Sequence, residues 1–286
     1  MIADNLTVII LTLNEEVNIR QSIKNVQGWA KDVFVLDSLS TDETQKIATD
    51  LGATVFTRKF DNYASQRNYA IKELPVETDW IFFLDADEYL TDELKNEIVK
   101  ELPISKFDGY YIKRRFYFLD RWIKYGGYYG TKILRLFKKD KATVLRDMNE
   151  HVSIDGEVAT LKHDFIHDDN KGVSDWIQKH NKYATYEALE LIKFEEKKED
   201  EDDEFANLFG SQPQRKRWVR EKIWNKLLPP LIRPIFYFFY RYILRFGFLD
   251  RKQGFIFHFL HAFWFMLLID VKYIEMKSKS KKQLKK

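Results

Sequence analysis

Cysteine is absent from this chain of 286 residues. The absence excludes a disulfide framework, a zinc–thiolate site and a cysteine nucleophile, and it fits a reducing compartment. The first residues also lack the basic segment, apolar stretch and cleavage site of a secretory signal peptide. We therefore expect the protein to reside in the cytoplasm.

Long uncharged runs are scarce. The longest stretch without a formal charge extends from Gln253 to Ile269, which is 17 residues, and it contains His258 and His261. A membrane-spanning helix needs about 20 predominantly apolar residues, so attachment in the plane of a membrane is the better prediction for this segment. With 45% hydrophobic and 32% charged residues, the composition also excludes a polytopic membrane protein, wholesale disorder and a collagen-like fibre.

Acidic residues are scarce towards the C-terminal end. The formal net charge is +3, but residues 1–210 hold 29 basic and 40 acidic residues, whereas residues 211–286 hold 18 and 4. Between these parts, residues 195–204 contain eight acids and two lysines, a composition typical of a solvated connector. We therefore expect a domain over residues 1–194, an acidic linker over 195–210 and a basic region over 211–286.

The basic region is also aromatic, which predicts membrane-associating amphipathic helices. On one helix, Arg233, Arg241 and Arg245 would share one side, opposite a mostly aromatic face. Such a helix suits the headgroup boundary, and six lysines from Lys277 onward would attract an anionic membrane surface. The alternatives are a helical subdomain packed on the main body and a segment that binds single-stranded nucleic acid. The density of Phe, Leu and Ile disfavours the latter, so we expect no nucleic acid partner.

The first hundred residues alternate between strand-like and helix-like segments. Apolar runs of strand length occur at Thr7–Leu13, Val33–Asp37, Thr54–Arg58 and Trp80–Leu84. The alternation predicts an α/β fold, Rossmann-like, with a mostly parallel sheet and helices on both faces. Ser40 and Glu43 have the spacing of a helix capping box. Gly52 marks the end of the same helix, and Thr91 is the expected N-cap of a later one.

Two aspartates follow the fourth predicted strand, in the segment Asp85-Ala86-Asp87. In a parallel sheet, ligands bind at the carboxyl ends of the strands. Positions i and i+2 of an extended chain point the same way, so both carboxylates can face one cation and the diphosphate that it binds. Oxygen ligands of this kind suit Mg²⁺ or Mn²⁺.

Four motifs occur in order along the same part of the chain: Val8–Glu15, Val35–Thr44, Gln66–Ala70 and Phe83–Glu88. Together they resemble the motifs of the family 2 glycosyltransferases, which have the GT-A fold. Three later segments look like the branch of that family that builds lipopolysaccharide core and related cell-surface glycans: Leu134–Phe137, Asn149–Val152 and Phe248–Asp250.

The resemblance implies roles for individual residues. Carboxylates accept hydrogen bonds from uracil and ribose, and a guanidinium pairs with phosphate. The residues that would line the nucleotide-sugar donor are Thr12, Leu13, Asn14, Glu15, Asp37, Ser38, Arg67, Asp85 and Ala86. The expected metal ligands are Asp85, Asp87 and His167, with His163 as the second choice of histidine. The family's glycine after the Asp37 turn is Leu39 here.

Inversion at an anomeric carbon requires an acceptor hydroxyl to attack opposite the leaving diphosphate while a carboxylate removes its proton. Glu150 is the candidate catalytic base, and Asp147 is the reserve. The resemblance therefore implies an inverting, metal-dependent transferase on the cytoplasmic face of the inner membrane, peripheral or monotopic. It would move a hexose, glucose in the first instance, from a UDP-sugar to a lipopolysaccharide-core or other lipid-linked glycan.

Three other functions stay open. A polyprenyl-phosphate glycosyltransferase would need no general base, because its acceptor is already anionic. A phosphohydrolase with an aspartyl nucleophile also uses two aspartates after a strand, but it usually has Thr or Val where this chain has Tyr89. The third is a non-catalytic adaptor that binds a sugar nucleotide and docks on membranes.

Overall fold

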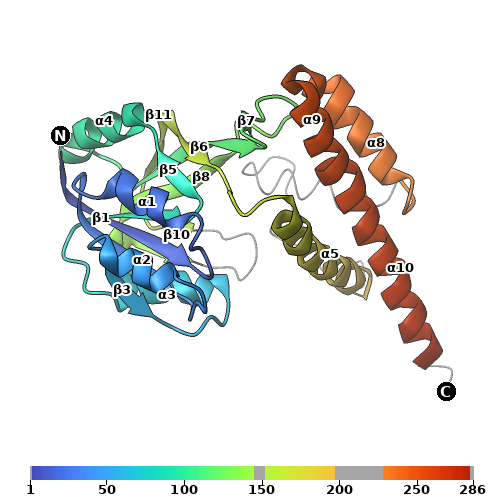
Figure 1. The fold of residues 1–286 in the computed structure, drawn as a ribbon, viewed down its shortest axis with the longest axis horizontal. Coiled ribbons are helices and arrows are strands. Elements are labelled where there is room, and N and C mark those ends of the chain that lie inside the picture. Colours follow the sequence, from blue (N-terminus) through green and yellow to red (C-terminus); the bar gives the residue numbers. More distant parts are fainter. Residues whose placement is uncertain (1, 145–151, 197–227, 284–286) are drawn as a thin grey trace. The chain divides into compact units, whose positions relative to one another are not determined.

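The computed structural model describes residues 2–144, 152–196 and 228–283, and Figure 1 shows their fold. Contacts divide the chain into two compact units. The first unit comprises residues 1–124 and 128–171, and the second comprises residues 125–127 and 172–286. The expected domain boundary at Phe194 stays a prediction, and this division falls ahead of it.

A mixed β-sheet forms the centre of the first unit (Figure 1). Its strands are β1 (Ala3–Thr12), β2 (Ala30–Asp37), β3 (Thr54–Thr57), β4 (Trp80–Asp85), β5 (Glu88–Leu90), β6 (Gly109–Phe118), β7 (Arg121–Trp122), β8 (Lys132–Lys138) and β11 (Val158–His167). Their order is β3-β2-β1-β4-β8-β6-β11-β5, and β7 pairs with β6. A separate ribbon joins β9 (Ala142–Val144) to β10 (Val152–Ile154).

The four strands expected from the sequence form the parallel part of this sheet. β1 lies between β2 and β4, and β3 pairs with β2, all in parallel. β8 is antiparallel to both β4 and β6, so β6 again runs in the direction of β4. The carboxyl ends of β1, β2, β4, β6 and β11 therefore lie at one edge of the sheet.

Helices cover both faces of the sheet, as the alternation predicts. The first face packs against α1 (Ile19–Val26), α2 (Thr44–Asp50) and α4 (Asp92–Glu101), and the second against α3 (Tyr63–Lys72). Alternate residues of β1 supply the two faces: Val8 and Ile10 belong to the first core, and Ile9 belongs to the second.

Helix ends test the capping predictions. Thr91 is the N-cap of α4, and its hydroxyl accepts a hydrogen bond from the Leu94 N–H. Gly52 follows α2 with a φ of 79°, which suits glycine at the end of a helix. The capping box is wrong: α2 begins at Thr44, and Ser40 instead donates both its N–H and its hydroxyl to Asp37.

The described part of the second unit consists of helices and short connections. The helices are α5 (Val173–Glu196), α8 (Arg233–Phe239), α9 (Arg251–His258) and α10 (Phe265–Gln283). A π-helical segment at Tyr240–Leu244 continues α8, and another at Phe259–Trp264 joins α9 to α10. α5 packs along α10, where the Lys272 ammonium donates to the Asn181 carbonyl and the Thr185 hydroxyl at 2.7 Å.

The sequence predicts three exposed arginines on one side of a helix in this unit, and the prediction is wrong for two of them. Arg233 and Arg241 are 4% and 6% exposed, whereas Arg245 is exposed. Arg233 pairs with Asp270, and Arg241 donates to the carbonyl oxygen of Gly126. Acceptors distant in the sequence thus draw these arginines inward, and helical periodicity alone does not reveal such partners.

Candidate active site

The polar ends of three neighbouring strands form the candidate donor site. Thr12 at the end of β1 pairs in register with Asp37 at the end of β2, and Leu11 pairs with Asp85 at the end of β4. The structure therefore brings together the strand ends that the sequence singled out.

A hydrogen-bond network fixes the turn after β2. The buried carboxylate of Asp37 accepts bonds from the Thr12 hydroxyl, from the N–H and hydroxyl of Ser40, and from the Gln45 amide, at 2.5–2.8 Å. These four bonds occupy the acceptor positions of a carboxylate, so a base that bonds Asp37 must displace one of them. In the same turn Leu39 has a φ of 66°, which is the conformation that glycine adopts without strain.

The loop after β1 lies against this turn. Asn14 donates its N–H to the Ser40 hydroxyl and accepts from the Thr41 N–H. Leu13 is 48% exposed, and the hydroxyl of Ser38 accepts a bond from the Gln66 amide. The loop thus presents side chains and backbone groups at the edge where a nucleoside is expected.

Glu15 connects the first strand to the segment after β11. Its carboxylate accepts from the Lys171 ammonium at 2.5 Å and from the Asn18 amide at 2.9 Å. Burial raises the pKa of Glu15, and the bonds from Lys171 and Asn18 only partly offset that effect. Lys171 gave no signal in the sequence, because the pairing joins positions far apart in the chain.

Two buried arginines hold Asp85. Arg67 donates to one carboxylate oxygen at 3.0 Å, and Arg135 donates to the other at 2.6 Å. Arg135 also donates to Glu88 at 2.7 Å. Burial alone would raise the pKa of Asp85, but the charges of Arg135 and Arg67 outweigh burial and lower it. The sequence predicts Arg67 at the donor site. Arg135 lies in the segment Leu134–Phe137, for which the sequence indicated no role in the site.

Asp87 has a different neighbour. One carboxylate oxygen lies 3.5 Å from Nε2 of His167, and Nδ1 of the same ring lies 3.6 Å from Glu88. His163 instead bonds Glu97 on α4 at 2.8 Å, and Ala86 is buried between the two aspartates. The structure thus brings His167, not His163, to the aspartate pair.

The residues present fit a hard cation at Asp87 and His167. A carboxylate oxygen and an imidazole nitrogen are ligands that Mg²⁺ and Mn²⁺ accept, together with phosphate oxygens and water. Within the described residues no group of three or more His, Asp or Glu side chains is arranged to hold a metal ion. Glu150 and Asp147, the candidate bases, lie outside the described residues.

A cationic surface adjoins His167 at the same sheet edge. The rings of His167, Phe116 and Tyr128 follow one another at centroid distances of 5.3 and 5.0 Å. The Arg114 guanidinium lies over Phe116 and Tyr128 at 5.9 and 5.7 Å and makes no ion pair within the described residues. The sequence showed Arg114 only as one of three consecutive basic residues.

The carboxylate of Asp164 on β11 is paired with a cation and a hydroxyl on the other side of β6. Asp164 accepts from Arg115 Nε at 2.9 Å and from the Tyr129 hydroxyl at 2.8 Å. Burial, together with the bond to Asp164, raises the pKa of Tyr129 to about 12. This hydroxyl therefore remains a hydrogen-bond donor at neutral pH.

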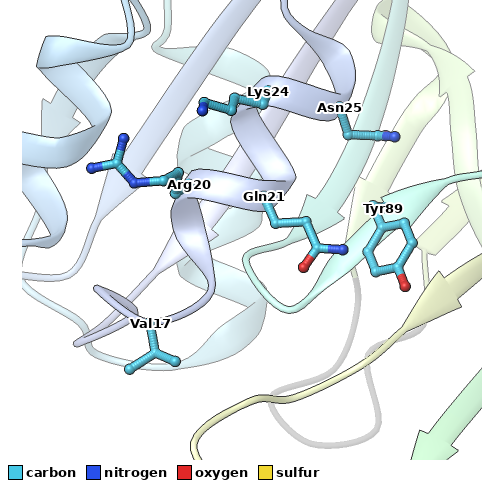
Figure 2. A pocket seen from close by; sticks show the side chains of 6 residues that line it. All are labelled: Val17, Arg20, Gln21, Lys24, Asn25 and Tyr89. Carbon is cyan, nitrogen blue, oxygen red and sulfur yellow. The ribbon is translucent and has the colours of Figure 1, made fainter. Parts of the chain in front are cut away.

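Two hollows lie near the aspartate pair. Figure 2 shows an open one between α1 and Tyr89, lined by Val17, Arg20, Gln21, Lys24, Asn25 and Tyr89. It contains none of the expected site residues. A smaller one reaches Asp87 and is bordered by Asn18, Ala86 and Asp168.

Comparison with known proteins adds the following. The model of the family named Glycosyl transferase family 2 matches residues 7–160, more than half of the chain. The chain is 28% identical over 246 residues to an uncharacterized glycosyltransferase of Rickettsia typhi, covering 80% of this chain and 77% of the relative. A second such relative, from Rickettsia bellii, is 27% identical over 276 residues, covering 92% and 84%.

Solved structures show a more distant likeness. Glucosyl-3-phosphoglycerate synthase of Mycobacterium tuberculosis, crystallised with Mn²⁺, uridine diphosphate and glucosyl-3-phosphoglycerate, is 21% identical, with a TM-score of 0.33. The match covers 40% of this chain and 44% of that one, so it spans less than half of the synthase.

Proposed function

The chain belongs to glycosyl transferase family 2, and on that premise we propose an inverting transferase that moves a hexose, glucose in the first instance, from a UDP-sugar. The acceptor is a lipopolysaccharide-core or other lipid-linked glycan. One observation carries the proposal: the two aspartates after β4 have different partners. Asp85 is held by two guanidinium groups, and Asp87 faces His167.

Each part of the site then has a task. The loop at Thr12–Glu15 and the Asp37 turn border the nucleoside, and Asp85 orients the ribose. Arg67 supplies positive charge near the diphosphate, because a guanidinium pairs well with phosphate oxygens. Asp87 and His167 would hold Mg²⁺ or Mn²⁺, which when bound neutralises charge that develops on the leaving diphosphate.

Glu150 removes the proton from the acceptor hydroxyl in this proposal, and Asp147 is the reserve base. General-base catalysis contributes about 100-fold to 10,000-fold in rate. Attack from the side opposite the diphosphate inverts the anomeric carbon.

The test is metal-dependent turnover of the sugar nucleotide. Asp87→Ala should abolish both transfer and the slower hydrolysis of UDP-glucose in the presence of Mn²⁺, because the cation loses its carboxylate ligand. Asp92→Ala, a change in the first turn of α4, is the matched control and should leave turnover intact. Unchanged turnover in Asp87→Ala would reject the metal assignment.

A second candidate is transfer to a polyprenyl phosphate, and Arg114 favours it. Arg114 lies near His167 and has no carboxylate partner among the described residues, and such a cation suits an acceptor that carries its own phosphate. Glu150→Gln separates the two reactions. If the acceptor is a hydroxyl, transfer falls at least about 100-fold while donor binding is retained; if it is a phosphate, Glu150→Gln is tolerated and Arg114→Gln raises the KM for the acceptor.

We place this activity at the cytoplasmic face of the inner membrane. The described residues contain one helix, Gly247–Lys279, that is long and apolar enough to cross a membrane by length and composition. Together with the lysine-rich end of the chain, it supports attachment to an anionic membrane that carries the acceptor.

A further inference from the structure

The interior of the second unit contains buried charged groups beside apolar residues such as Phe257 and Ile269. Asp270 is fully buried, and Arg233 is 4% exposed. Arg233 Nε donates to Asp270 at 2.7 Å, and the Leu231 N–H donates to the same carboxylate at 2.8 Å. A buried ion pair thus ties the start of α8 to α10.

A second polar set lies inside the same unit, near the turn between α8 and α9. Arg241 donates to the Gly126 carbonyl, and the buried Asp250 accepts from the Tyr125 N–H at 2.8 Å. His258 is fully buried and lies so close to Gly126 that a Cβ at that glycine would approach the ring to 2.1 Å.

The outside of α8 is apolar. Ile232, Ile235, Phe236, Phe239 and Ile243 are between 44% and 56% exposed, and their spacing places them on one side of the helix. We call these five residues the apolar face. Phe255 on α9 and Phe259 at the start of the following π-helical segment are also exposed. Both hydrophobic cores among the described residues belong to the first unit.

In a water-soluble helical domain the apolar stripe of a helix turns inward, whereas the apolar face of α8 is exposed and two arginines of the same helical segment are buried. Ionisable groups that face a bundle interior and pair there, with apolar groups outside, are typical of helices in lipid. A contiguous exposed apolar surface also marks a membrane or protein contact. Cations flank the surface, since Arg245, Arg251 and Lys252 are exposed at the turn, and they suit anionic headgroups.

The lengths of the helices decide how deep this surface can enter. α8 and its continuation have 7 and 5 residues, about 18 Å at 1.5 Å per residue. α9 and the following π segment have 8 and 6 residues, about 21 Å. Neither reaches across a hydrocarbon core of about 30 Å.

α10 does not extend the span, because α5 packs along it. α5 exposes charged side chains at Asp175, Lys179, Lys182 and Glu190, and Lys272 of α10 bonds α5 directly. A helix with these charges is excluded from hydrocarbon by their desolvation cost. The part of Gly247–Lys279 that lies beside α5 therefore stays outside the acyl layer.

We propose that the hairpin of α8 and α9 enters one leaflet only and buries the apolar face among lipid acyl chains. The buried Arg233–Asp270 pair holds the start of α8 against α10 at the base of the inserted hairpin. α5, with the part of α10 that lies beside it, remains on the aqueous side. This extends the membrane attachment proposed above from contact with headgroups to insertion, and it does not depend on the transfer reaction.

The absence of cysteine permits a direct test on the full chain. Phe239→Cys carries an environment-sensitive fluorophore on the apolar face, and Glu190→Cys carries it on α5 as the matched control. Both proteins are mixed with vesicles of phosphatidylcholine and phosphatidylglycerol that bear a nitroxide either in the headgroup or within the acyl chain. Far-ultraviolet circular dichroism checks that each variant is folded.

With vesicles, the fluorescence emission of the label at Phe239→Cys should shift to the blue. The acyl-chain nitroxide should quench most of this fluorescence, and molar salt should not prevent the quenching. The label at Glu190→Cys should remain unquenched by that nitroxide. Quenching at Phe239→Cys by the headgroup nitroxide alone, or release by salt, would overturn insertion in favour of surface attachment.

Two further outcomes would also overturn the proposal. Strong acyl-chain quenching at both positions would indicate a spanning helix. A blue shift without vesicles, in a particle of twice the monomer mass, would indicate that a second copy covers the apolar face.

A second experiment needs no label. Phe236→Glu should lose vesicle binding, whereas Ile104→Glu on the first unit should retain it.

Discussion

Asp85 and Asp87 show how partners, rather than residue type, assign a role. From the sequence, both carboxylates are expected to face one cation, and the resemblance implies that Asp85 also lines the donor. In the structure the Asp85 carboxylate accepts hydrogen bonds from two arginines, and Asp87 lies beside a histidine. A carboxylate already neutralised by guanidinium groups has less to offer a cation, so Asp87 is the stronger candidate for the metal ligand.

Arg135 is the residue whose removal should cost the most stability at this site. Arg135→Met leaves Glu88, which is 1% exposed, without its cation and removes one of two cations from Asp85. Because breaking a buried ion pair strands a charge, we expect a loss of about 3–5 kcal/mol in the free energy of unfolding. Urea unfolding measures it.

Arg114→Met is the matched control, since that arginine makes no ion pair in the described part of the chain. Its loss should remain within about 0.5 kcal/mol, as is usual for surface changes. Equal losses in the two variants would contradict the role assigned to Arg135.

At the scale of elements, strand ends and helix starts are coupled through single side chains. Thr91 caps α4, and its hydroxyl also donates to the Asp164 carbonyl in β11 at 3.0 Å. Asp164 in turn accepts hydrogen bonds from Arg115 and Tyr129. One capping residue therefore links the end of a helix to the strand that leads to His167.

Thr91→Ala should lower the free energy of unfolding by about 1–2 kcal/mol, because it removes the cap and leaves the Leu94 N–H without its acceptor. Thr49→Ala in α2 serves for comparison, since Thr49 is exposed and its hydroxyl donates to the Gln45 carbonyl in the same helix. Thermal unfolding of both variants measures the difference, and similar melting temperatures would exclude the capping role.

At the scale of the whole molecule, the charge imbalance of the sequence has two physical causes. Residues 1–210, with 40 acids, contain the proposed donor and cation site, and residues 211–286, with 18 basic residues, contain the hairpin proposed to enter a leaflet. Several acids of the first unit pair with cations, among them Asp61 and Asp85, so they also make its stability depend on pH.

Stability should fall below about pH 4. Folding lowers the pKa of Asp61 through Arg58 and Ser65, and it lowers the pKa of Asp85 through its two arginines against the opposing effect of burial. A carboxyl group with a lowered pKa contributes stability above its ordinary pKa of about 4, and that stability is lost as the pH falls. Glu15 and Asp168, whose pKa values are raised by burial, act in the opposite sense and only partly compensate.

Melting temperatures measured at constant ionic strength from about pH 3 to about pH 7 test this expectation. This range includes the pH values at which Asp and Glu titrate. Asp61→Asn should flatten the acid side of the profile. A melting temperature that stays constant down to the acid limit would show that these pairs contribute nothing to stability.

Local patterns in the sequence determined a large part of this protein. Alternating strands and helices established the α/β class, ordered motifs established family 2 membership, and the order of strands brought Thr12, Asp37 and Asp85 to one edge. Each follows from interactions within a strand or helix, or from the rule that parallel strands end at the same edge of a sheet.

Only the tertiary structure decided which distant residues become partners. Arg135 with Asp85, Lys171 with Glu15 and Arg233 with Asp270 are separated by 50, 156 and 37 positions. A sequence pattern reports the face on which a residue lies, but not the opposite charge that folding brings there. For that reason two of the three arginines expected at a membrane surface, Arg233 and Arg241, are buried, whereas Phe236 and Phe239 on the same helix are exposed.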